Sequence, residues 1–175
     1  MAGKVRAKRG AEGARINGKD VLAYLNFGAS ATEAAPVWAL IGGQTTADLS
    51  MSADEIDANC KDSGGWGESY AGIRSTELSM ECIATKEDEA YAALKDAFIH
   101  SETVDICRYC TSDGTADRNW YSITEISDTT PHDDMVTFSL TLKGIGAPTF
   151  YTNVKKIADV KGAMTGETVI VSVGG

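Results

Sequence analysis

Cysteine, proline and histidine are scarce in this sequence, and no long hydrophobic run occurs. The 175 residues include 4 Cys, 3 Pro and 2 His. Four cysteines are too few for a disulfide-rich secreted scaffold, and no stretch approaches the ~18 apolar residues that a membrane-spanning helix needs. With 43% hydrophobic residues, the chain is too apolar to be disordered and long enough to bury a core. We therefore expect one globular domain and no membrane insertion.

Positive charge is concentrated at the beginning of the chain. Residues 1–20 hold six basic and two acidic residues, whereas the rest holds ten basic and 23 acidic residues, for a total net charge of −9. An acidic body disfavours binding to a phosphate backbone, because that affinity comes from cations that displace counterions. No apolar segment follows the basic residues, as a signal peptide would require. We expect residues 1–18 to form a flexible basic N-terminal arm that docks on a partner.

Residue types that commonly carry catalysis or bind metals do not converge in this sequence. Cys107 and Cys110 form a C-x-x-C pair, but residues three apart in a strand point to opposite faces, and no second pair follows. His100 falls at the end of a predicted helix and His132 in a predicted turn, and neither belongs to a nucleophile motif. We expect no enzyme activity, no metal and no cofactor.

Alternation of apolar and polar residues predicts a mainly β fold. In residues 75–84 and 135–143, apolar side chains occupy every second position, which is the period of a strand with one buried face. Residues 47–51 alternate in the same way. One helix is predicted at residues 86–99, with Thr85 as its N-cap and a stripe of apolar residues at helical spacing. Further strands are predicted at residues 21–27, 37–41, 103–109, 120–126 and 169–173.

Other segments lack a clear period. Residues 52–71 join two strong strands through a mainly polar stretch, and loops of this length are usually functional or disordered. We expect a loop that contacts another surface; the alternative is a locally packed loop with Trp66 folded onto its own sheet. Residues 144–148 are predicted to form a loop, and residues 149–175 to form an extended C-terminal arm outside a β domain at residues 19–148.

Three segments resemble the phage major tail protein, or tail-tube, family. They are GKDVLAYL at residues 18–25, the stretch at residues 43–79 that contains SADEID and KDSGGW, and VTFSLTLKGIGAPT at residues 136–149. The order and combination of these segments carry the resemblance, which covers about residues 16–150. It implies an antiparallel β-sandwich or partial barrel flanked by one α-helix, with a long inter-strand loop and extended terminal arms. Type VI secretion tube proteins are similar in fold.

The resemblance also implies a function. Family members are structural virion proteins that form stacked hexameric rings, and the resulting tail tube is a conduit for DNA delivery. The implied partners are other copies of the chain, the tape-measure protein and genomic DNA inside the lumen, and the tail terminator and distal tail proteins. The implied location is the virion tail, assembled in the host cytoplasm.

The lumen that the resemblance implies needs a wall with one face on the domain core and one face toward water, and the polar strand faces agree with this. We expect eight residues to face this lumen: Asp48, Ser50, Glu77, Ser79, Glu81, Thr137, Ser139 and Thr141. We expect the loop at residues 52–71 to contact a neighbouring subunit or ring through Asp54, Ile56, Asp57, Lys61, Asp62 and Trp66.

Two other classes of protein remain open at this point. The first is a monomeric β-sandwich module that binds a ligand, which predicts exposed aromatic residues clustered on a concave surface. Trp38, Trp66 and Trp120 are instead scattered along the chain. The second is a metal-dependent enzyme, for which elemental analysis would be decisive.

Overall fold

The computed structural model describes residues 16–61, 66–166 and 169–173 of the chain. Within these residues the fold is mainly β with one α-helix, as the sequence predicts. The predicted N-terminal arm lies mostly outside the described residues. The elements are η1 (Gly18–Asp20), β1 (Val21–Asn26), β2 (Trp38–Leu40), β3 (Gln44–Asp57), β4 (Ser69–Ile83), α1 (Glu89–Ile99), β5 (Thr103–Cys110), β6 (Thr115–Thr129), β7 (Thr137–Thr152), η2 (Ile157–Asp159) and β8 (Ile170–Ser172).

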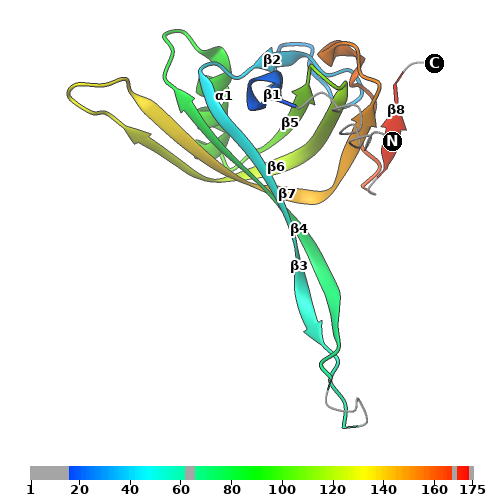
Figure 1. Cartoon of the computed structure of the whole chain (residues 1–175). Coiled ribbons are helices and arrows are strands. Elements are labelled where there is room, and N and C mark those ends of the chain that lie inside the picture. The colour runs from blue at the N-terminus through cyan, green and yellow to red at the C-terminus, as the bar shows by residue number, and fades with distance from the viewer. Residues whose placement is uncertain (1–15, 62–65, 167–168, 174–175) are drawn as a thin grey trace, which may run out of the picture.

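All eight described strands belong to a single open sheet (Figure 1). Its order is β2-β1-β5-β6-β7-β4-β3 with antiparallel neighbours, and β8 pairs in parallel with the end of β7. The sheet curls until β3 approaches β1, where side chains rather than a ladder bridge the gap. Gln44 Nε2 donates to Ala23 O of β1 at 2.7 Å, and Arg108 Nη1 reaches across from β5 and donates to Ala47 O at 2.8 Å. The result is a partial barrel whose seam lies between β1 and β3.

Two hydrophobic clusters lie on opposite faces of the sheet. Val104 and Ile106 of β5 join the larger cluster, which α1 covers with Leu94 and its neighbours. Cys107 and Tyr109 of the same strand join the smaller cluster. Because successive strand residues alternate between faces, one strand can contribute to both cores. The second core covers only part of its face, so the rest of that face is left open.

The helix begins three residues later than predicted, and Thr85 is not its N-cap. Asp88 takes this role, since its Oδ1 accepts hydrogen bonds from the N–H groups of Ala90 at 3.0 Å and Tyr91 at 3.1 Å. Glu87 has a φ of 61°, which lies outside the helical range. The residues before Asp88 therefore cannot extend the helix.

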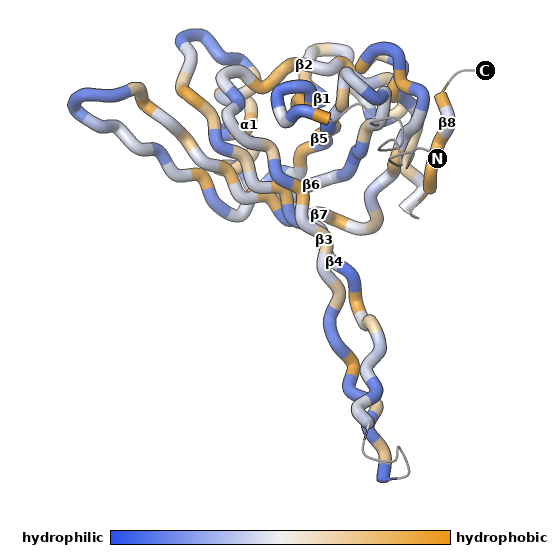
Figure 2. Tube along the Cα trace, viewed as in Figure 1, coloured by the Kyte–Doolittle hydropathy of each residue, from blue (hydrophilic) through white to orange (hydrophobic). Residues whose placement is uncertain are grey.

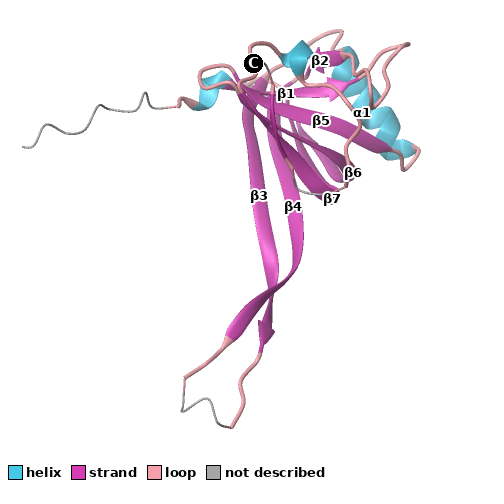
Figure 3. Cartoon of the chain, turned by 90° about the vertical axis from the view of Figure 1, so that its right-hand side faces the viewer, coloured by secondary structure: helices cyan, strands magenta, loops and turns pink. Residues whose placement is uncertain are grey.

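The predicted loop at residues 52–71 is mostly a β-hairpin that projects from the body (Figures 1 and 3). β3 continues to Asp57 and β4 resumes at Ser69, with Ser52 opposite Ser75 and Ala53 opposite Arg74. Because both faces of the hairpin are exposed to solvent, its strands do not need to alternate apolar and polar residues, and they do not. Figure 2 shows this as a mainly hydrophilic stalk with isolated hydrophobic residues. Only residues 58–68 connect the two strands.

The predicted loop at residues 144–148 is wrong, because β7 runs through it to Thr152. Gly144 allows β7 to pass close to β4: a Cβ there would lie 1.7 Å from Thr76 Oγ1. The extended C-terminal arm predicted at residues 149–175, outside the β domain, is also wrong for the residues that follow. Tyr151, Val154 and Val160 are buried in the second core. Their mixed spacing matches no regular period because much of this segment is irregular.

Candidate assembly surface

The eight residues predicted to line a lumen lie on one face of the sheet formed by β3, β4 and β7. Asp48 is opposite Ser79, which is opposite Thr141, and this row crosses all three strands. A second row contains Ser50 opposite Glu77, and a third row contains Glu81 opposite Ser139. All eight are exposed or half-exposed. The opposite face carries the larger core, including Leu78, Met80, Cys82, Phe138, Leu140 and Leu142.

Strand β6 adds residues to this polar face that the sequence pattern did not predict. Glu125 is opposite Thr141, and Ser127 is opposite Ser139. A bulge between Ile123 and Glu125 shifts the alternation, and there the Thr124 hydroxyl donates to Thr141 O at 3.0 Å. This extra residue explains why neither face of β6 is cleanly apolar in sequence.

The polar face is acidic. Its rows contain the carboxylates of Asp48, Glu77, Glu81 and Glu125. Lys143 is the one cation in the described rows, and its Nζ pairs with Glu77 Oε2. The net negative charge means that the face repels a phosphate backbone.

The polar face is formed by four strands, β6, β7, β4 and β3. Each of the two outer edges of this group lacks a partner strand among the described residues. β3 is the last strand in the sheet order, and the outer edge of β6 is unpaired beyond Ser122, where β5 begins with Thr103. Unpaired edges expose backbone N–H and C=O groups and act as templates for another strand. Both long edges border the polar face.

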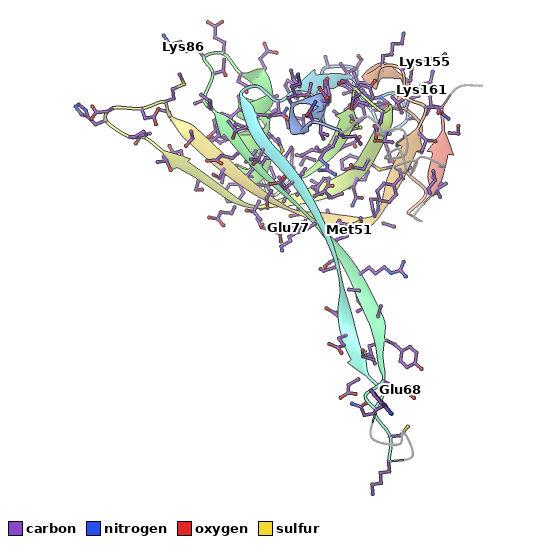
Figure 4. All side chains as sticks on the ribbon, in the orientation of Figure 1. Met51, Glu68, Glu77, Lys86, Lys155 and Lys161 are labelled. Carbon is purple, nitrogen blue, oxygen red and sulfur yellow. The ribbon has the colours of Figure 1, made fainter. Side chains whose placement is uncertain are left out.

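The projecting hairpin carries most of the residues that the sequence predicts as contacts. Ile56, Trp66, Tyr70 and Ile73 are 54%, 83%, 62% and 79% exposed. Figure 4 shows Met51 and Glu77 where the hairpin leaves the body and Glu68 toward its far end. Of the predicted contact residues, Asp54, Ile56, Asp57, Lys61 and Trp66 lie in the hairpin and its connection, and Asp62 lies outside the described residues.

A buried ion pair joins the covering segments to the sheet, and no sequence pattern indicates it. The Arg118 Nε donates to Asp105 Oδ1 at 2.9 Å, and both side chains are almost fully buried. The same guanidinium donates to Glu33 O and Gly162 O at 2.8 Å each, and it lies 5.2 Å from the ring centroid of Trp38. Burial alone would lower the pKa of Arg118, but its hydrogen bonds and charge pairing with Asp105 raise it.

The residues considered for chemistry do not come together. Burial raises the pKa of the Cys107 thiol well above its ordinary value, and Cys110 Sγ lies 3.2 Å from Ser112 Oγ. Within the described residues, no group of three or more His, Cys, Asp or Glu side chains is placed to hold a metal ion. No helix there has the length and hydrophobicity to cross a membrane.

An open antiparallel sheet flanked by one helix, with a hairpin extending from two of its strands, is the tail-tube fold of structural β proteins. The family model for the phage tail tube protein matches residues 15–150. The chain therefore belongs to the phage tail tube protein family, and its role is that of a structural component of a virion tail. No curated protein matches its sequence.

Solved structures agree on the fold. The tail of an empty GTA (gene transfer agent) particle, refined with C6 symmetry, has a TM-score of 0.65 at 24% identity, covering 77% of this chain and 97% of that chain. The SPP1 tail tube has a TM-score of 0.65 at 16% identity, covering 80% and 81%. The baseplate of the anti-feeding prophage has a TM-score of 0.58 at 9% identity, covering 78% and 94%. At these identities, the likeness shows the fold alone.

Proposed function

We propose that copies of this chain join edge to edge into hexameric rings, and that the rings stack into a tube that conducts DNA into the host. Genomic DNA and the tape-measure protein occupy the lumen, and tail terminator and distal tail proteins bind the two ends. Assembly takes place in the host cytoplasm. The observation that carries this proposal is the pair of unpaired edges on either side of one four-stranded polar face.

Strand directions make these two edges compatible. The strands β6, β7, β4 and β3 alternate in direction, and their number is even. When the β3 edge of one copy meets the β6 edge of the next, the new pair is therefore antiparallel, and the alternation continues around a ring. Such a head-to-tail contact closes when the rotation between copies divides a full turn. The C6 symmetry of the GTA tail favours six copies.

The polar face lines the lumen in this arrangement. Its opposite face is occupied by the protein's own core, so only the polar face is available to enclose water. The eight predicted residues and Glu125 would form an acidic and hydroxyl-rich surface. Such a surface repels phosphates and lets DNA slide without binding.

Charge along the long axis of the molecule favours head-to-tail stacking of rings. The hairpin carries Asp54, Asp57 and Glu68, and the basic segment with Lys155 and Lys161 lies at the opposite end (Figure 4). In a stack, the acidic hairpin of one ring meets the basic end of the next ring. Opposite charges at a contact of this kind increase the association rate and fix the orientation.

A proline at Met51 tests edge pairing without breaking the subunit. Ala47 O faces the outer edge, since it accepts from Arg108, and in a strand every second residue shares this direction. The N–H of Met51 therefore also faces the outer edge, and its side chain is 62% exposed. Met51→Pro should abolish tubes in negative-stain microscopy, because proline removes one donor from the free edge and obstructs an added strand.

Met51→Ala is the matched control, because it removes the same side chain and keeps the N–H group. It should form tubes like the unmodified chain, and circular dichroism should show that both variants fold. Tubes of normal yield from Met51→Pro would contradict edge pairing through β3. An unmodified chain that stays monomeric at high concentration would contradict the tube itself and favour a monomeric binding module.

A further inference from the structure

A groove of about 500 Å³ lies in the seam between β1 and the first residues of β3. Lys19, Val21 and Leu22 line one side, and Thr45 and Thr46 line the other. The groove thus combines an exposed cation with apolar side chains. Lys19 has no hydrogen-bond or ion-pair partner among the described residues.

Arg108 limits where a neighbouring strand can pair with β3. Its guanidinium donates to Ala47 O at 2.8 Å and is held by Asp117 through contacts of 3.1 and 2.8 Å. Arg108 and Asp117 have side chains only 17% and 15% exposed, so this arrangement is well packed. The edge acceptor at Ala47 is therefore already occupied, and added pairing begins beyond it, at residues 48–57.

Antiparallel pairing then directs the turn between β6 and β7 toward the beginning of β3. A β6 edge at residues 123–129 of the adjacent copy runs from the far end of β3 toward its beginning. With Thr129 paired near Asp48, the chain that follows, residues 130–136, would emerge next to Ala47, where the groove begins. This turn carries Asp133 and Asp134, and its Met135 is 64% exposed.

The turn and the groove are complementary in chemistry. The Asp133 side chain is 92% exposed, and its one partner within the described part of the chain is His132, which is 98% exposed, at 3.5 Å. Lys19 in the groove offers the opposite charge, and Leu22 offers an apolar wall for Met135. The positive charge of Arg108 is balanced by Asp117, which leaves Lys19 as the available cation in the described lining of the groove.

We propose that the turn at residues 130–136 of one copy docks in the groove beside Lys19 of the adjacent copy in the same ring. This inference rests on the proposed function and adds a specific lateral contact to it. The docked turn fixes the register of the β3–β6 pair, because a shift along the edge would remove the turn from the groove. It also covers the seam of the partial barrel with a second copy of the chain.

Cross-linking in assembled tubes tests this contact. Lys19→Cys and Asp133→Cys are combined in a chain whose exposed Cys60 is replaced by serine. Tubes are treated with a short bis-maleimide and separated by denaturing electrophoresis. We expect a ladder of covalent oligomers that ends at the number of copies in one ring, since each copy links to the next. The control combines Lys19→Cys with Glu89→Cys, at the start of α1, and should give no ladder.

The outcomes separate the two proposals. Tubes without a ladder would overturn the docked turn and leave the tube intact, whereas an unmodified chain without tubes would overturn the proposed function. If the cysteine pair itself prevents assembly, charge reversal decides. Lys19→Glu should then lower tube yield at least several-fold, and adding Asp133→Lys and Asp134→Lys should restore it. Failure of this restoration would overturn the contact.

Discussion

At the scale of single residues, Arg118 is the most constrained side chain of the second core. It is fully buried, and its hydrogen bonds reach Asp105 on β5, Glu33 before β2 and Gly162 after η2. These contacts join three segments that are distant in sequence. A buried charge is costly unless it is paired, so Asp105 is needed for the fold whenever Arg118 is present.

Replacing Arg118 with methionine should therefore destabilise the protein by about 3–5 kcal/mol, because Asp105 is left as an unpaired buried charge. Urea denaturation followed by circular dichroism measures the loss. The double variant Arg118→Met and Asp105→Leu should recover much of it, since neither charge remains. A loss below about 1 kcal/mol in the single variant would mean that water solvates Asp105 and that the pair does not hold the segments.

At the scale of elements, the hairpin of β3 and β4 differs from the rest of the sheet. β4 pairs with β7 only from Glu77 to Ile83, so its earlier residues pair with β3 alone. An isolated two-stranded hairpin is marginally stable in water. Exposed Trp66 and Tyr70 add little to its stability as it stands, and they become useful only against another surface.

Trp66→Ala should lower the yield of tubes and leave the monomer folded, because the ring is 83% exposed in the single chain. Sedimentation and negative-stain microscopy measure the yield, and circular dichroism reports the fold. We expect a change in unfolding free energy within about 0.5 kcal/mol, as for most surface substitutions. Trp66→Phe keeps an aromatic ring and should retain most tubes. Full-length tubes at normal yield from Trp66→Ala would exclude Trp66 as an assembly contact.

At the scale of the whole molecule, the charge of the polar face can be changed by substitutions that leave the core residues in place. Glu77 is a poor choice for reversal because it pairs with Lys143 across the ladder. Glu81 and Glu125 are opposite hydroxyl side chains, Ser139 and Thr141. Their replacement therefore alters the charge of the surface more than the stability of the sheet.

Glu81→Lys combined with Glu125→Lys should leave tubes intact and slow the ejection of DNA, because lysines bind phosphates that the carboxylates repel. Ejection from particles that carry the variant is followed by the fluorescence of a DNA-binding dye. Glu81→Gln with Glu125→Gln removes the charge without reversing it and should have a smaller effect. Ejection at the original rate in the lysine variant would argue against a lumen on this face.

The sequence predicts the faces of a strand only where apolar and polar residues alternate regularly along it. The faces of β4 and β7 followed from the alternation predicted in residues 75–84 and 135–143, because side chains of a strand with one buried face must alternate. The bulge of β6 at Thr124 could not be predicted in this way, since one extra residue reverses the alternation. The cap at Asp88 was missed because Thr85 is also a favourable N-cap by residue type, and the sequence does not show where the helix begins.

The amino-acid order by itself determined the mainly β fold, the single helix and the acidic polar face, since each depends on local pattern or composition. The family followed from the resemblance of three segments to known sequences. The tertiary structure alone decided that residues 52–71 form a hairpin, that β7 passes Gly144, and that Arg118 meets Asp105. These features depend on contacts between segments that are far apart in the chain. There the backbone is stabilised by a neighbouring strand or segment, and the local spacing of apolar residues does not indicate which one. The free edges of β3 and β6 belong to the same group, because an edge exists only once the order of strands is known.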